Sequence, residues 1–168
     1  MPREFSSAAK SILHNEILPG YPSKKAALLR TLWLAQEEFG VVDRDAMDAV
    51  AQELELAPAH VYGVFSFYTL FRQQGQGRYV LDVCATLPCA LRGARDIVHA
   101  LEEKLGIQAG ETTPDGMFTL RKVECLADCD HAPMLQLGER YIRDLTPTSV
   151  CELVDSLRAE ADAHSPSA

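Results

Sequence analysis

Five cysteines stand in this chain of 168 residues, and four of them form two close pairs. Cys84 and Cys89 are separated by four residues, and Cys125 and Cys129 by three. Each pair follows a stretch typical of a β-strand, so both pairs can meet where two strands of one sheet end. Four thiolates that meet can bind a metal ion or an iron–sulfur cluster, because soft sulfur ligands suit both. The spacing therefore predicts a metal centre on Cys84, Cys89, Cys125 and Cys129.

The spacing does not decide what this centre would hold. The two irons of a 2Fe–2S cluster take two thiolates each, and a structural zinc ion can take four. Neither pair has the C-x-x-C spacing of a thioredoxin-type dithiol, and the plant-type ferredoxin spacing C-x4-C-x2-C does not fit either. Four unrelated buried cysteines are the remaining explanation. On spacing, iron–sulfur and zinc both stay open.

Other features have competing explanations. Cys151 lies beside the apolar stripe of the last predicted helix, where we expect it to pack as a small hydrophobe. His131 could replace a thiolate as in Rieske centres. Because four cysteines are available, we expect His131 to be a loop residue near the centre instead. Gly75 and Gly77 lack a third glycine and precede a strand, so they form no nucleotide fingerprint. The aromatic-rich stretch 61–71 is expected in the core, with a partner-facing surface as the alternative.

The elements that would position the cysteines alternate between strand and helix. Alternating apolar residues predict a first strand over 79–83, and a second strand begins at Phe118 and ends at Val123. Apolar residues at helical spacing predict a helix between them that ends at Gly106. Later predicted elements are a strand over 134–137, a type II′ turn at Gly138-Glu139, a strand around Tyr141 and a helix from Thr146-Pro147. This order suits a thioredoxin-like fold, with a small sheet covered by helices.

The first part of the chain is predicted to be helical. Ser23 and Asp43 can cap two helices, and Pro58 suits the first turn of a third. The inward face of that third helix is predicted to extend to Tyr68. A further, weak helix is possible near residues 6–17.

A change of pattern at a Gln- and Gly-rich joint divides the chain. We expect a helical N-terminal module over residues 1–74, a cysteine-bearing thioredoxin-like domain over 75–160 and a polar tail over 161–168. The fold class is α/β.

Composition and charge exclude several classes of function. A formal net charge of −8 argues against sequence-independent binding to nucleic acid or anionic lipid. No apolar run approaches the roughly 20 residues that a membrane span needs. The N-terminus carries no apolar signal segment, so we expect the cytoplasm, where thiols stay reduced. An odd number of cysteines there argues against a disulfide framework.

Several motifs resemble a known family. The segment 84–89, CATLPC, followed by Leu91-Arg92-Gly93, is similar to the first cluster loop of the small thioredoxin-like iron–sulfur subunit of NADH–quinone oxidoreductase (respiratory complex I). The likeness continues in order through 110–116 (GETTPDG), 123–126 (VECL), 132–134 (APM) and 144–147 (DLTP), and upstream in 35–37 (AQE) and 61–68 (VYGVFSFY). It extends from about Tyr21 to Pro147 and includes the cysteine spacing.

The resemblance implies a thioredoxin-like ferredoxin domain with one 2Fe–2S cluster on the four paired cysteines. It implies an electron-transfer subunit, inactive alone, beside a larger subunit that binds NADH and FMN. Further subunits would hold it at the inner face of the cell membrane. NAD-reducing hydrogenases and NAD-dependent formate dehydrogenases contain close relatives, so the host complex stays open. A zinc-bound structural module is the alternative from a different class.

The chain departs from the family's pattern beside its last paired cysteine. Ala127 and Asp128 stand where the family tends to have glycine and a small residue, and His131 stands where Asn or Thr is common. At an effective dielectric near 20, a carboxylate about 8 Å from an added electron opposes it by roughly 2 kcal/mol, before screening by solvent and salt. We therefore predict that Asp128→Asn raises the reduction potential of the cluster. The alternative is that Asp128 points into water and changes nothing.

Overall fold

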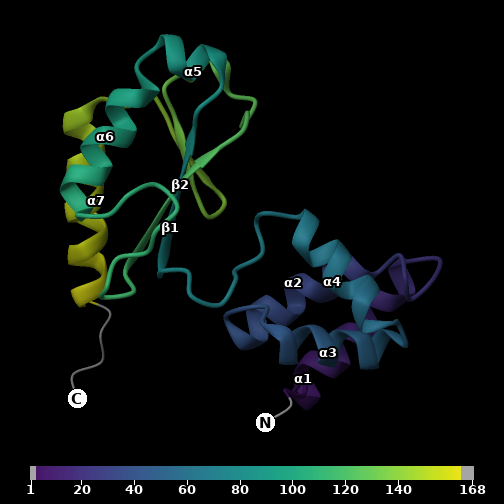
Figure 1. Ribbon diagram of the computed structural model, residues 1–168. Coiled ribbons are helices and arrows are strands. Elements are labelled where there is room, and N and C mark those ends of the chain that lie inside the picture. Colours follow the sequence, from purple (N-terminus) through teal and green to yellow (C-terminus); the bar gives the residue numbers. More distant parts are fainter. Residues whose placement is uncertain (1–2, 164–168) are drawn as a thin grey trace. The chain divides into compact units, whose positions relative to one another are not determined.

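The computed structural model describes residues 3–163 of the chain (Figure 1). The chain divides into two compact units, the helical Met1–Gln74 and Gly75–Ala168, which holds the sheet. None of the helices in the described range is long and apolar enough to cross a membrane.

Capping residues set the ends of several helices in the first unit. Ser6 Oγ accepts a hydrogen bond from the Ala9 amide at the start of α1, and Asp43 accepts one from the Ala46 amide at the start of α3. Pro58 lies in the first turn of α4, where the amide that proline lacks would have no partner within the helix. The helices are α1 (Ser7–Ile12), the π-helical η1 (Leu13–Ile17), the 3-10 helix η2 (Leu18–Gly20), α2 (Leu28–Phe39), α3 (Arg44–Leu54) and α4 (Pro58–Phe67). The helix expected near residues 6–17 is confirmed.

Two details of the predicted helices are wrong. Ser23 Oγ accepts a hydrogen bond from the Ala26 amide at 3.3 Å, as a helix cap would. However, the amides of residues 26–28 donate to carbonyls three residues earlier, as in a 3-10 helix, so α2 begins only at Leu28. Tyr68 does not face inward: its side chain is 43% exposed, because α4 ends at Phe67 and the backbone then becomes extended.

The first unit has an apolar core of its own. Leu32 of α2, Val50 of α3 and Val61 of α4 are completely buried in one cluster. Full burial of side chains of this size contributes about 1.5–3 kcal/mol each. Packing of α3 against both α2 and α4 therefore holds these helices together.

The second unit is a mixed four-stranded sheet with helices, as the sequence predicts. Its strand order is β2-β1-β3-β4, with β1 parallel to β2 and antiparallel to β3. Of the two residues that join β3 to β4, Gly138 alone has a positive φ, which fits the predicted type II′ turn. The elements are β1 (Tyr79–Cys84), α5 (Leu87–Leu91), α6 (Ala94–Leu105), β2 (Phe118–Val123), the 3-10 turn η3 (Cys129–His131), β3 (Leu135–Leu137), β4 (Arg140–Ile142) and α7 (Pro147–Ala163).

Three features of this unit differ from the prediction. The short helix α5 inside the first cysteine loop was not expected, and the third strand begins at Leu135, one residue late. Helix α7 continues to Ala163, because Ala161 is buried and extends its apolar face. The polar tail predicted over 161–168 is therefore wrong for its first three residues, and residues 164–168 lie outside the described range.

Helices α6 and α7 lie side by side over one face of the sheet (Figure 1). Leu81 and Val83 of β1 and Leu120 of β2 are completely buried in this layer. Because successive side chains of a strand alternate between the two faces, Asp82 and Cys84 lie on the opposite face. The first cysteine loop therefore starts on the face that α6 and α7 leave open.

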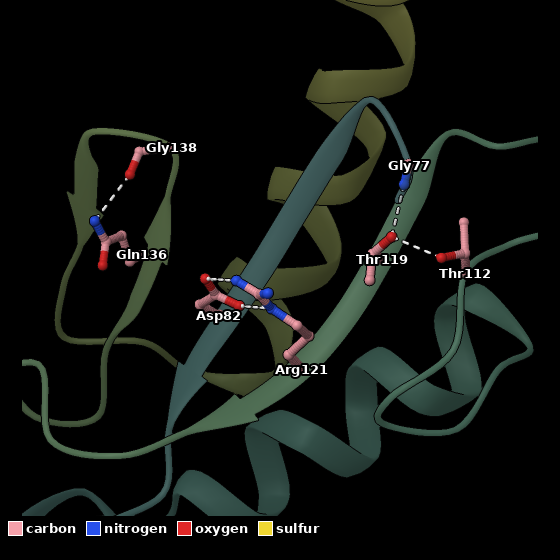
Figure 2. Close-up of polar contacts among 7 residues, drawn as sticks. All are labelled: Gly77, Asp82, Thr112, Thr119, Arg121, Gln136 and Gly138. Atoms are coloured by element: carbon pink, nitrogen blue, oxygen red, sulfur yellow. Dashed lines mark hydrogen bonds and ion pairs between the residues drawn. The ribbon is translucent and has the colours of Figure 1, made fainter. Parts of the chain in front are cut away.

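Polar contacts on that opposite face fix β1 against β2 (Figure 2). Arg121 donates two hydrogen bonds to the Asp82 carboxylate, both at 2.6 Å, across the paired strands. Thr119 Oγ1 accepts from the Gly77 amide at 2.7 Å. A Cβ at Gly77 would come within 2.7 Å of the Phe118 backbone, so only glycine allows this close approach. These contacts set the register of the two strands and hence the place where both end.

Candidate metal centre

The four paired cysteines lie on two loops that leave the parallel strands β1 and β2. Cys84 ends β1 opposite Val123, which ends β2. Directly afterwards the Ala85 amide donates to the Val123 carbonyl at 3.0 Å. Both loops therefore begin at the same edge of the sheet, as the sequence predicts.

The first loop folds back through α5, and its two cysteines are buried. Pro88 lies in the first turn of α5, which suits its missing amide, and Cys89 follows it. Cys84 is 2% exposed and Cys89 is 1% exposed. Their buried apolar neighbours are Ala94, Ala132 and Met134. The chain thus shields this thiol pair from water.

The second loop is exposed, and one backbone angle shapes it. Cys125 and Cys129 both lie at the surface. Between them Ala127 has a φ of 62°, in the left-handed region, which costs a residue with a Cβ about 1–2 kcal/mol. This conformation places the Ala127 amide 3.3 Å from Cys125 Sγ, to which it donates a hydrogen bond. The backbone strain is therefore coupled to the position of a sulfur atom.

Hydrogen bonds join the two loops at Cys84. Burial acts to raise the pKa of Cys84, but hydrogen bonds to its sulfur outweigh burial, so the pKa is lowered. The Thr86 hydroxyl, 3.4 Å from Cys84 Sγ, makes the largest of these contributions, followed by the amides of Thr86 and Leu126. Leu126 belongs to the second loop. Leu126 also packs against the buried cluster that contains Cys84 and Cys89, so the two loops are in contact.

The other thiols oppose one another's ionisation. Burial, together with the hydrogen bond to Cys84 and negative charge on Cys84 and Cys129, raises the pKa of Cys89 to about 11. Loss of solvent raises the pKa of Cys129, and negative charge on Cys125 and Cys84 raises it further. Cys129 is thus close enough to both thiols of the first loop to repel them. Four thiolates can coexist here only with a compensating cation.

The arrangement of the sulfurs fits a two-iron cluster. The thiol of Cys84 influences the pKa of Cys89 most directly among the thiols, and that of Cys125 the pKa of Cys129, so the thiols form two pairs. A zinc ion with four thiolates at about 2.3 Å would hold all its sulfurs at roughly 3.8 Å from one another. Within residues 3–163, no three of these thiols lie within 4.8 Å of one another. Two separate thiol pairs, with amide hydrogens directed at their sulfurs, suit a 2Fe–2S cluster.

The remaining candidate residues have other surroundings. Cys151 is half-buried on α7 and packs against the core, as predicted. His131 Nδ1 lies 3.1 Å from Asp144 Oδ2, so a carboxylate holds its ring in an exposed part of the loop. Asp128, Asp130 and His131 place ligand atoms within 4.8 Å of one another, but acidic groups of this kind are common without a bound metal ion.

The Asp128 carboxylate does not point into water, so that alternative is wrong. Its side chain is 13% exposed, and Arg143 Nε donates to Asp128 Oδ2 at 2.5 Å. Whether Asp128→Asn raises the reduction potential stays a prediction. Sequence reasoning missed Arg143, because 15 residues and a hairpin separate it from Asp128. It also missed α5, for which Pro88 at a first helical turn is the available signal.

Comparison with known proteins agrees with this geometry. Residues 14–158 match the family described as "Thioredoxin-like [2Fe-2S] ferredoxin". The chain belongs to the thioredoxin-like 2Fe–2S ferredoxin family. Membership confirms the predicted fold class and the prediction that the cofactor is one 2Fe–2S cluster.

This ferredoxin is similar to proteins named as parts of an NADH dehydrogenase and of an NADH-quinone oxidoreductase. It is 42% identical over 146 residues to the mitochondrial NADH dehydrogenase [ubiquinone] flavoprotein 2 of Dictyostelium discoideum, covering 85% of this chain and 59% of that protein. It is 40% identical over 139 residues to a subunit of the NADH-quinone oxidoreductase of Rhizobium meliloti (strain 1021), covering 83% of both chains.

Among solved structures, the ferredoxin is similar to a chain of an NAD+-reducing [NiFe]-hydrogenase in the air-oxidized state. The TM-score is 0.70 and the identity 22%, over 79% of this chain and 23% of that chain. At this identity the likeness concerns the fold.

Ala127→Gly should stabilise the second loop of the ferredoxin, because glycine adopts a positive φ without strain. We expect the free energy of unfolding in urea to rise by about 0.5–1 kcal/mol. Ala85→Gly is the matched control, since Ala85 is an exposed residue of the first loop with no positive φ. Equal changes in the two variants would contradict the assignment of strain to Ala127.

Proposed function

We propose that this chain is an electron-transfer subunit of an NADH–quinone oxidoreductase and that Cys84, Cys89, Cys125 and Cys129 bind its 2Fe–2S cluster. The contact between the two cysteine loops supports the proposal, because Leu126, which lies between Cys125 and Cys129, packs against the buried cluster that contains Cys84 and Cys89. Relatives at least 40% identical over most of this chain are named as parts of NADH dehydrogenase and NADH–quinone oxidoreductase. A 2Fe–2S cluster supplies a centre that gains or loses one electron.

The two loops would have different tasks in this role. The first loop shields Cys84 and Cys89, and the polarity around sulfur ligands tunes a reduction potential. Amide hydrogens at Cys84 and Cys125 stabilise negative charge on these sulfurs. The second loop keeps Cys125 and Cys129 at the surface, so a partner protein would approach the centre from this side.

The partner in this proposal is a larger subunit that binds NADH and FMN. Gly75 and Gly77 lead into strand β1 and not into a helix, so they offer no dinucleotide site. NADH oxidation would then take place on the partner, and this chain would exchange electrons with its flavin. Further subunits of the complex would hold the chain on the cytoplasmic side of the membrane.

An equivalent subunit of an NAD-reducing hydrogenase or an NAD-dependent formate dehydrogenase is the second candidate. The observation behind this second candidate is that the chain shares its fold with part of an NAD+-reducing [NiFe]-hydrogenase. Neighbouring genes distinguish the hosts. A gene for a hydrogenase or formate dehydrogenase catalytic subunit would favour the second candidate, and genes for membrane-spanning subunits of a quinone reductase would favour the first.

Serine at Cys84, Cys89, Cys125 or Cys129 should weaken or remove the cluster, because a hydroxyl is a harder and less readily deprotonated ligand than a thiol. We expect each variant to lose most of its iron and acid-labile sulfide. Cys151→Ala is the control, and it should keep both, since this thiol packs on α7. The ligand set is wrong if Cys151→Ala loses the cluster while one of the four serine variants keeps it.

The cluster-loaded chain should not be reduced by NADH unless a flavin-bearing partner is present. A chemical reductant such as dithionite should bleach its visible absorption directly, which is the positive control. Adding the NADH- and FMN-binding subunit of the same organism should make reduction by NADH possible. Rapid NADH-dependent bleaching of the purified chain, with no flavin detectable by fluorescence, would contradict the proposed division of tasks.

A further inference from the structure

The second cysteine loop is tied to β4 and the residues that follow it. Tyr141 Oη donates to the Leu126 carbonyl at 3.0 Å, and Arg143 Nε donates to Asp128 Oδ2 at 2.5 Å. These contacts lie on either side of Ala127, the residue with left-handed backbone. The two side chains therefore hold the loop at its most strained point.

The same segment also holds the end of the loop. The Asp144 amide donates to the His131 carbonyl at 3.0 Å, and the Leu145 amide donates to the Pro133 carbonyl at 2.9 Å. No residue of 125–131 is buried, and of these residues only Leu126 packs against an apolar cluster, so apolar contacts alone do not fix the rest of this stretch. Polar contacts from residues 141–145 must therefore do so.

Arg143 also balances charge beside a cysteine. Asp128 directly precedes Cys129, and the Asp128 side chain is largely shielded from water, so its charge is screened less than a free surface charge. The hydrogen bond and charge of Asp128, with the charges of Asp130 and Asp144, raise the pKa of Arg143. The guanidinium therefore stays charged and offsets the carboxylate.

We propose that Tyr141 and Arg143 are positioning residues for the cluster. Tyr141 fixes Leu126, which packs against the buried cluster that contains Cys84 and Cys89, and Arg143 holds Asp128 and offsets its charge beside the centre. The inference rests on the proposed ligand set, because Leu126 and Asp128 matter only if the adjacent cysteines bind the cluster.

The test uses the full chain loaded with its cluster and two measurements. EPR-monitored redox titration gives the reduction potential, and the decay of visible absorption in the presence of an iron chelator gives the rate of cluster loss. Arg143→Gln should lower the potential, because the Asp128 charge is then uncompensated and opposes the added electron. Asp128→Asn should raise it, because Asp128 then no longer balances the positive charge of Arg143. The double variant should lie between them, close to the wild type.

Tyr141→Phe separates mechanical positioning from charge. It removes one hydroxyl and keeps the ring, so we expect about fivefold faster cluster loss, as for one net hydrogen bond, with little change in potential. Arg143→Lys should restore most of the potential lost in Arg143→Gln, since it restores the charge. Arg140→Gln is the matched control, because it removes the same charge from an exposed residue of β4 and should shift the potential less.

The outcomes keep this inference apart from the proposed function. A wild-type chain without iron and sulfide would overturn the proposed function and the inference with it. The inference alone would be overturned if the wild-type chain holds an intact cluster, and if both Arg143→Gln and Tyr141→Phe keep the wild-type potential and rate of cluster loss. Equal shifts in Arg143→Gln and Arg140→Gln would also overturn it.

Discussion

The parallel pairing of β1 with β2 is the constraint on which the metal centre depends. It ends both strands at one edge of the sheet, so that two loops 41 positions apart, counted from Cys84 to Cys125, begin side by side. The Asp82–Arg121 pair and the close approach of Gly77 to β2 fix the register of this pairing. A slip of one residue would turn Cys84 towards α6 and α7. The polar face of the sheet thus determines where the thiols lie.

The two loops are held by different means, and this difference follows from their burial. The first loop packs its sulfurs in a buried cluster of apolar side chains, so the hydrophobic effect positions them. The second loop contains no buried residue from 125 to 131 and is held mainly by hydrogen bonds and ion pairs from the β4 side. Ionised thiols of the two loops repel one another, and a bound cationic iron–sulfur core relieves this repulsion. Metal binding and folding of this edge of the sheet should therefore be coupled.

Local patterns in the sequence were enough to predict most of the fold. Alternation gave β1, helical spacing gave α6, and caps such as Asp43 and Pro58 gave the helix starts, because each depends on neighbours within a few residues. The edge where the thiols meet was predictable for the same reason. Arg143 and Tyr141 were not, because their partners lie across a hairpin whose register no local pattern specifies. The prediction that a polar tail begins at residue 161 was wrong, because a single alanine is too weakly apolar to indicate that the helix face at Ala161 is buried.

The central claim is that the two thiol pairs together bind a 2Fe–2S cluster. Metal and acid-labile sulfide analysis of the purified chain tests it most directly, because zinc and iron–sulfur sites use the same ligands but only the cluster contains inorganic sulfide. We predict two irons and two sulfides per chain. One zinc per chain with no sulfide would contradict the claim.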